Sequence, residues 1–232
     1  MRHQLLAVLT ISNVAAYKGA MMGKLTECDD ANTNLELDWD PKDYSVFTCS
    51  NSMPFANVDS ILFDLVKENP KFDPKNDEVY HQCMDKAIEY KDPIPVRGDH
   101  RPNWARFGEY LYAPPQRWLH NLEHGSIVLL YHPCADDDEV EKLRAIVTAC
   151  IYRHVITPYA QLSPDRPLAL VGWGSRLEMN HVDDNEVIDY IKNYSRRAPE
   201  DIVRDGRYDK FLIKPARFVA GDNDDKICQN FH

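Results

Sequence analysis

The stretch His120-Asn121-Leu122-Glu123-His124-Gly125 holds two imidazoles and a carboxylate within five residues. On a helical turn, His120 and His124 lie at positions i and i+4 with Glu123 beside them, so all three can face one ion. On an extended strand the two histidines would share a face, and Glu123 would point to the opposite one. The residue types and their spacing therefore predict a metal or acid/base site, and only the helical turn adds the glutamate to it.

Imidazole nitrogens and carboxylate oxygens are ligands of borderline divalent cations such as zinc and copper. Another histidine, upstream of the motif, is expected to complete the site. The predicted ligand set is therefore His120, His124, Glu123 and His100. Groups behind the ligands orient them, and the side chains expected in that role are Asn121, Trp104 and Tyr110. The residue types leave open which of the two metals binds.

The same residues admit a purely structural interpretation. A histidine beside a strand end often hydrogen-bonds only the backbone, and Glu123 has Arg117 nearby as a salt-bridge partner. In that case the aromatic loop at residues 104–118 would be a contact surface, and the chain would be a secreted interaction module. The two interpretations differ in whether the purified protein holds metal.

The motif also matches the His-x-x-Glu-His pattern of a class of zinc peptidases, in which the glutamate is a general base. That pattern needs a long helix. Here Pro114-Pro115 precedes the motif and Gly125 with a strand-like run follows it, so at most two helical turns fit. A metal-dependent hydrolase with Glu123 as general base is therefore a weaker alternative.

Hydrophobic patterns predict the elements that position the motif. Apolar residues at helical spacing predict helices at residues 57–69, 77–90, 136–152 and 183–195. Apolar runs predict strands at residues 126–131, 155–158 and 168–173, with a last strand at 211–213. Between the second helix and the motif, residues 91–117 are rich in proline and aromatic side chains and are expected to form a loop.

This order of elements predicts an α+β fold, in which helices pack on a mixed or antiparallel sheet. A split βαβ sheet of ferredoxin-like type is the expected arrangement. Residues 17–96 are expected to form an irregular and helical extension stapled by disulfides, and residues 97–232 the α+β domain that carries the motif.

Composition restricts the partners of the chain. Its 232 residues carry 27 basic and 37 acidic side chains, a formal net charge of -10. This sign argues against nucleic acid, whose phosphates need a basic face. No apolar run beyond the first residues approaches the ~18 residues that a membrane span needs. No transmembrane segment is therefore expected once a signal peptide is removed.

The N-terminus has the pattern of a secretory signal. A short basic start leads into an apolar core that ends at Val14-Ala15-Ala16, which fits the small-residue rule for cleavage. Residues 1–16 are therefore predicted to be a signal peptide, and the mature chain to be secreted. Asn193-Tyr194-Ser195 is an N-glycosylation sequon, which such a chain could use.

Cysteine usage agrees with export, because an even number of cysteines in a secreted chain suggests a disulfide framework. The candidates for pairing are Cys28, Cys49, Cys83, Cys134 and Cys228. Cys150 differs, because it lies on the apolar stripe of a predicted helix, where a buried free thiol is expected. The connectivity cannot be read from spacing.

From about residue 99 to residue 200 the chain resembles a domain family of unknown function, found in exported bacterial proteins and in a tumour-suppressor-inducible membrane protein of animals. The matching stretches are His100-Arg101-Pro102-x-Trp104, Gly108-x-Tyr110, residues 120–125, Ile156-Thr157-Pro158-Tyr159, residues 169–174, Tyr194 and Ala198-Pro199-Glu200. The resemblance implies no activity. The animal protein implies a C-terminal membrane segment, which this chain lacks before His232, so secretion is expected rather than anchorage. The residues therefore favour a secreted protein with a divalent-metal site.

Overall fold

The computed structural model describes residues 17–18, 28–53 and 56–231. The predicted signal peptide, residues 1–16, lies outside this part of the chain. None of the helices described is long and apolar enough to cross a bilayer.

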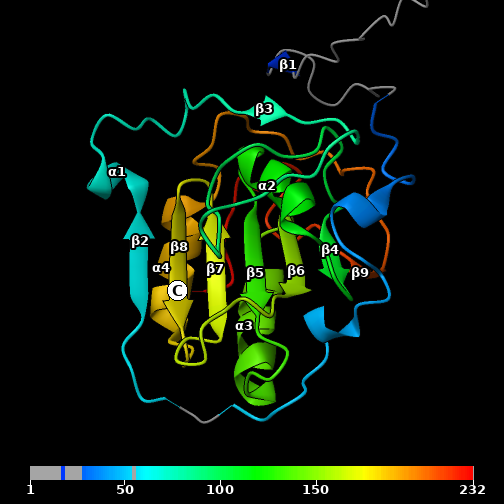
Figure 1. The fold of residues 1–232 in the computed structure, drawn as a ribbon. Coiled ribbons are helices and arrows are strands. Elements are labelled where there is room, and N and C mark those ends of the chain that lie inside the picture. Colours follow the sequence, from blue (N-terminus) through cyan, green and yellow to red (C-terminus); the bar gives the residue numbers. More distant parts are fainter. Residues whose placement is uncertain (1–16, 19–27, 54–55, 232) are drawn as a thin grey trace, which may run out of the picture.

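A seven-stranded mixed sheet lies at the centre of the molecule (Figure 1), in the order β2-β8-β7-β5-β6-β4-β9. β5 and β6 are parallel, as are β6 and β4, and the other neighbours are antiparallel. A separate two-stranded pair joins β1 to β3. The strands are β1 (Tyr17–Lys18), β2 (Ile61–Asp64), β3 (Tyr80–His81), β4 (Gly108–Tyr110), β5 (Ile127–Tyr131), β6 (His154–Pro158), β7 (Leu168–Gly172), β8 (Ser175–Met179) and β9 (Leu212–Pro215).

The helices begin where a short polar side chain can accept hydrogen bonds from the free backbone N–H groups of the first turn, or where proline lacks such an N–H. The Asp136 carboxylate caps one helix by accepting hydrogen bonds from the backbone N–H groups of Asp138 and Glu139, and Asp183 caps another through Glu186. The four α-helices of the described chain are α1 (Leu65–Glu68), α2 (Pro115–Glu123), α3 (Asp137–Cys150) and α4 (Asp184–Tyr194). Two short 3₁₀ helices occupy Leu35–Leu37 and Tyr44–Val46.

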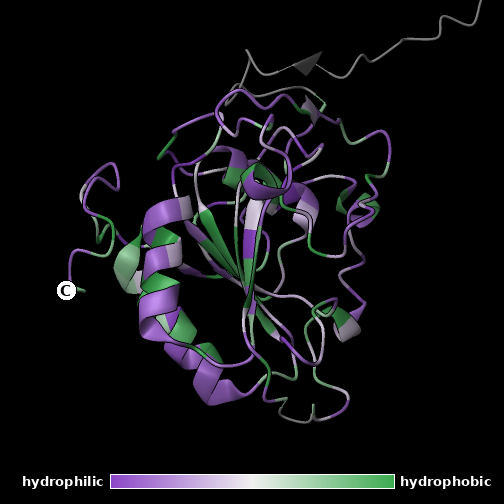
Figure 2. Cartoon of the chain, turned by 90° about the vertical axis from the view of Figure 1, so that its left-hand side faces the viewer, coloured by the Kyte–Doolittle hydropathy of each residue, from purple (hydrophilic) through white to green (hydrophobic). Residues whose placement is uncertain are grey.

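The two faces of the sheet bury different layers, as the alternation along β5 shows. Ile127 and Leu129 point to the face covered by α3 and α4, whereas Val128 and Leu130 pack with the apolar side of α2. Figure 2 shows helices with apolar inner and polar outer sides packed along one side of the sheet. The motif therefore belongs to the layer opposite α3 and α4.

The predicted α+β class is confirmed, with helices packed on a mixed sheet. Strands β5, β6, β7 and β9 and helices α3 and α4 form where the hydrophobic patterns placed them. The ferredoxin-like arrangement does not form, because β5 and β6 are direct parallel neighbours and β6, which lies between β4 and β5, is parallel to both of them. β8 was not predicted, although its side chains alternate between buried and half-buried positions from Ser175 to Met179.

Both helices predicted before the motif are wrong. Residues 57–69 contain β2 followed by the four-residue α1, because the apolar run pairs with β8 at the sheet edge. Residues 77–90 contain only β3. The backbone N–H of Gln82 donates to the carbonyl of His100, so this segment uses its hydrogen bonds between strands instead of along a helix. The described part of the extension is therefore mostly irregular, with the strands β1, β2 and β3, the short α1 and two 3₁₀ helices.

The six cysteines form three disulfides, Cys28–Cys83, Cys49–Cys134 and Cys150–Cys228. The prediction of a free thiol at Cys150 is wrong. Its helix stripe does bury it, but the backbone N–H of Cys228 also donates to the carbonyl of Cys150, which brings the C-terminal segment alongside the end of α3.

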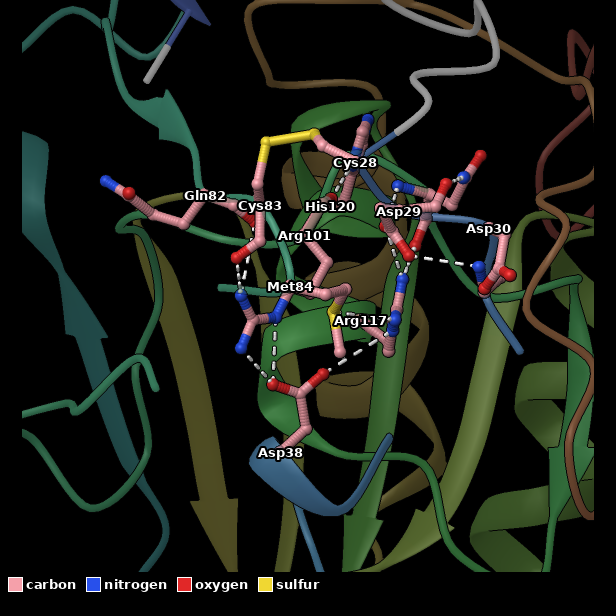
Figure 3. A network of polar contacts seen from close by, with 12 residues as sticks. Cys28, Asp29, Asp30, Asp38, Gln82, Cys83, Met84, Arg101, Arg117 and His120 are labelled. Carbon is pink, nitrogen blue, oxygen red and sulfur yellow. Dashed lines mark hydrogen bonds and ion pairs between the residues drawn. A yellow bond between two sulfur atoms is a disulfide. The ribbon is translucent and has the colours of Figure 1, made fainter. Parts of the chain in front are cut away.

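A buried ionic network attaches the extension to the rest of the fold (Figure 3). The Arg101 guanidinium donates to the carboxylate of Asp38 and to the carbonyl of Cys83, at 2.8 and 2.5 Å. The Arg117 guanidinium donates to the carboxylate of Asp29 at 2.7 Å. These four charged side chains are at most 1% exposed, so none of them has water as an alternative partner.

Peptide mapping under non-reducing conditions tests the connectivity. For protein produced in an oxidising compartment, we expect three cross-linked peptide pairs joining Cys28 to Cys83, Cys49 to Cys134 and Cys150 to Cys228. A free thiol at Cys150, or its pairing with a cysteine other than Cys228, would contradict the arrangement at the end of α3.

Removal of one charge from the network should destabilise the fold strongly. Arg117→Met leaves Asp29 buried without its ion-pair partner, and we expect the free energy of unfolding to fall by about 3–5 kcal/mol in urea titrations. Lys142→Met is the matched control, because it breaks the exposed Lys142–Asp184 pair and should cost less than about 1 kcal/mol. Equal effects of the two substitutions would show that the network does not hold the extension.

Candidate metal centre

Three histidines and one glutamate from three segments of the chain converge in the interior. His81 lies in β3, His100 on the loop bridged to it, and His120 with Glu123 in the last turn of α2. The imidazole centroids are 4.6–4.8 Å apart in every pairing of the three. One ligand atom from each of the four residues lies within 4.8 Å of all the others. The histidines are fully buried and Glu123 is 5% exposed.

The ends of α2 determine where its ligands point. Pro115 occupies the first turn, where a missing N–H costs nothing, and the helix ends at Glu123 with His124 as its C-cap. Gly125 then adopts φ 81°, and a Cβ there would lie 2.7 Å from the Arg196 backbone, so only glycine fits. His120 and Glu123 consequently share one side of a single turn, as the helical interpretation of the motif predicted.

Hydrogen bonds behind two of the rings fix their tautomers. The Nδ1 of His120 lies 2.6 Å from the carbonyl of Arg101, and the Nδ1 of His100 lies 2.8 Å from the carbonyl of Gly98. A carbonyl only accepts, so each Nδ1 carries the proton, and in the neutral ring each Nε2 presents a lone pair. The Nε2 of His120 is buried and has no hydrogen-bond partner among the described residues.

The Nε2 of His100 lies 2.9 Å from Oε2 of Glu123, and the Nε2 of His81 lies 3.4 Å from the same oxygen. With Nδ1 of His100 already protonated, a neutral ring would set a lone pair against a carboxylate oxygen. Two acceptors at this distance repel unless a cation is shared between them. That cation is either a proton or a metal ion.

Burial keeps two histidines of the cluster, His81 and His120, in the neutral form that binds metal. Burial, followed by the neighbouring imidazoles, holds the pKa of His120 well below its ordinary value. Burial also lowers the pKa of His81, although Glu123 opposes the shift. Burial alone would raise the pKa of Glu123, but His100 and His81 outweigh it and hold that pKa below its ordinary value. The Glu123 carboxylate thus stays ionised beside the His81 imidazole, which resists protonation.

His124 lies beside this cluster and not inside it. Its ring centroid is 4.7 Å from that of His120, and its Nε2 is 3.2 Å from the carboxylate of Glu200. Burial lowers the pKa of His124 in spite of Glu200. The Trp104 ring contacts both histidines of the motif. Its centroid lies 4.9 Å from the ring centroid of His120 and 4.4 Å from that of His124. His81 occupies the place in the cluster that the sequence suggested for His124.

The other residues expected around the site have different roles. The Asn121 side chain exchanges two hydrogen bonds with the backbone of Ala105, which anchors the loop that carries Trp104. Tyr110 donates instead to the carbonyls of Arg106 and Tyr208.

The interpretation in which the histidines are structural and the loop at residues 104–118 is a contact surface finds little support. Arg117 pairs with Asp29 instead of Glu123. The aromatic side chains of residues 104–118 are at most 7% exposed, so they offer no contact surface.

Sequence reasoning missed His81 because the surrounding residues have apolar side chains at helical spacing. On the predicted helix, Val79 and Cys83 face inward, which turns His81 away from them. The extended segment, held by the Cys28–Cys83 disulfide and its pairing with His100, brings the ring inward instead. Its position two residues before a candidate disulfide cysteine was the one available signal.

The donor set suits a single ion. Three imidazoles and a carboxylate match the nitrogen and oxygen preferences of zinc and copper, whereas calcium and magnesium prefer oxygen alone. In a tetrahedral zinc site, ligand atoms about 2.1 Å from the ion lie about 3.4 Å from one another. The most distant donors, within 4.8 Å of each other, would therefore move together by about 1 Å on binding.

No curated protein and no solved structure matches this chain. A family model described as "Protein of unknown function (DUF3105)" matches residues 81–206. The match covers more than half of the chain, and it includes His81, His100, His120, Glu123 and Glu200. The chain therefore belongs to this family of proteins of unknown function.

Proposed function

We propose that this protein binds one divalent transition metal, zinc or copper, through His81, His100, His120 and Glu123. The observation that carries the proposal is the 2.9 Å contact between the Nε2 of His100 and the Glu123 carboxylate. Beside it lies the unpartnered Nε2 of His120. Buried acceptors that converge without donors are costly unless they share a cation.

The geometry favours binding over hydrolysis. Catalytic zinc sites use three protein ligands and leave a position open for water, whereas closed four-ligand sites are structural. Here four donors are present, and none of their side chains is more than 6% exposed. Glu123 also contacts two of the histidines directly, a position suited to a ligand and not to a general base that acts on bound water.

We further propose that the protein is secreted and functions in an oxidising compartment. All six cysteines pair, which is typical of exported chains and rare in the cytosol. The pattern at residues 1–16 supports a cleaved signal. Asn193 is exposed on α4, although Ser195 of the same sequon is buried, and glycosylation there remains a prediction. The likeness to the animal membrane protein remains a prediction as well.

Metal content is the direct test. Protein purified without a polyhistidine tag and then loaded is expected to hold about one zinc or copper ion per chain by elemental analysis and native mass spectrometry. His120→Ala removes a ligand and should weaken affinity by more than about 100-fold, beyond the range for loss of an outer partner. His181→Ala is the matched control, because the His181 side chain is 63% exposed and far along the chain from the cluster. Equal metal content in the wild type and His120→Ala would sink the proposal.

The pH dependence follows from the sign of the histidine shifts. Because the pKa values of His81 and His120 are lowered, both rings stay neutral until the pH falls below the ordinary histidine value of ~6.5. Metal binding should displace the proton that otherwise bridges the 2.9 Å contact between His100 and Glu123. Below pH ~6.5 the affinity should fall more steeply as the other rings compete for protons.

Calorimetry in buffers of different ionisation enthalpy, between pH ~5 and ~8, measures both the affinity and the protons released. A flat affinity without proton release would assign the ion to carboxylates elsewhere in the chain.

A further inference from the structure

We propose that His124 and Glu200 form an entry position, a transient binding position for the divalent metal between solvent and the four-donor centre. The inference rests on the proposed metal-binding function and adds a route to it. It concerns two residues that stand outside the group able to hold the ion permanently.

The position adjoins the centre through both the backbone and the side chains. His124 follows Glu123 directly, and its ring centroid lies 4.7 Å from that of His120. The backbone N–H of Glu200 donates to the carbonyl of Glu123 at 3.0 Å, which ties the loop after α4 to the end of α2. An ion at this position is therefore one side chain away from the unpartnered Nε2 of His120.

The two side chains offer potential ligand atoms, ring nitrogens and a carboxylate oxygen, that no hydrogen bond in the described chain uses. His124 is fully buried, yet neither of its ring nitrogens makes a hydrogen bond. Its Nε2 lies 3.2 Å from Oε2 of Glu200, and that oxygen is likewise buried without a hydrogen-bond partner. A nitrogen and a carboxylate oxygen placed in this way are a pair of ligands for a borderline cation.

The exposure of the side chains indicates from which end of the group an ion would enter. The Glu200 side chain is 24% exposed, whereas those of His124, His81 and His100 are 0% and that of Glu123 is 6%. His120 is fully buried as well. Within the described residues, Glu200 is thus the member of this group that reaches solvent most. Its carboxylate can attract a hydrated cation, and His124 can take over a ligand site before the ion reaches His120.

The free-energy cost of removing water from a divalent ion explains why such a step is needed. A divalent ion that crossed a buried region without ligands would lose its hydration with nothing in return, at a cost of many kcal/mol. Passage from Glu200 to His124 and then to His120 keeps the ion coordinated throughout. A transient position of this kind changes the rates of loading and release and leaves the equilibrium at the centre untouched.

The test separates rate from equilibrium. Metal-free protein is mixed with Co²⁺ in a stopped-flow instrument, and the absorption of the bound ion gives the loading rate. Release is then followed after addition of excess chelator. In Glu200→Gln, we expect loading and release to slow by the same factor, about tenfold or more, since a charged entry raises association rates by at least that much. The final cobalt content should equal that of the wild type.

Glu141→Gln is the matched control, because it removes the same charge from a side chain that is 72% exposed on α3. It should load at the wild-type rate. His124→Asn provides a second variant with the carboxylate intact, and it should also slow both rates. Thermal unfolding of each metal-free variant shows whether its fold is retained.

The outcomes are distinct. Unchanged rates in Glu200→Gln and in a folded His124→Asn would overturn the entry position while leaving the metal centre in place. A lower final cobalt content in Glu200→Gln would also overturn it, because Glu200 would then be a permanent ligand. A wild-type protein that takes up no metal would refute the proposed function itself, and the inference with it.

Discussion

The contact between His100 and Glu123 constrains the whole centre. The Nδ1 of His100 is committed to the carbonyl of Gly98, so its other nitrogen meets the carboxylate at 2.9 Å with only a lone pair to offer in the neutral ring. A buried carboxylate cannot be left opposite an acceptor without a cation. Whatever occupies this position must therefore carry positive charge, as a shared proton or the proposed metal ion would.

The network that attaches the extension also orients the ligands. Arg101 donates through its guanidinium to Asp38 and to the carbonyl of Cys83, while its own carbonyl accepts from Nδ1 of His120. One residue thus links the extension to His120, whose Nε2 has no hydrogen-bond partner among the described residues. His81 lies two residues before Cys83. The Cys28–Cys83 disulfide and the β-bridge to His100 hold this segment, and His81 with it, in place. The irregular extension is consequently part of the site and not merely its cover.

Sequence reasoning found what short-range periodicity encodes. The one-turn geometry of His120 and Glu123 follows from i, i+3 spacing, and β5, β7, α3 and α4 follow from their apolar patterns. It failed where long-range pairing decides the structure. β2 has the apolar spacing of a helix but pairs with β8 at the sheet edge, and His81 is brought in by a disulfide whose partner the spacing did not reveal. Strand pairing and disulfide connectivity depend on the packed chain, which no local window contains.

The distribution of the ligands gives the metal a mechanical consequence. His81 belongs to the extension, whereas His120 and Glu123 belong to the helix that packs on the sheet. An ion bound by all three would cross-link these two parts, beside the disulfide and the arginine network. Binding stabilises a fold by about 4 kcal/mol when free metal is 1,000 times its dissociation constant. The proposed ion would also relieve the conflict between the buried acceptors, so we expect metal binding and the docking of the extension to be one coupled process.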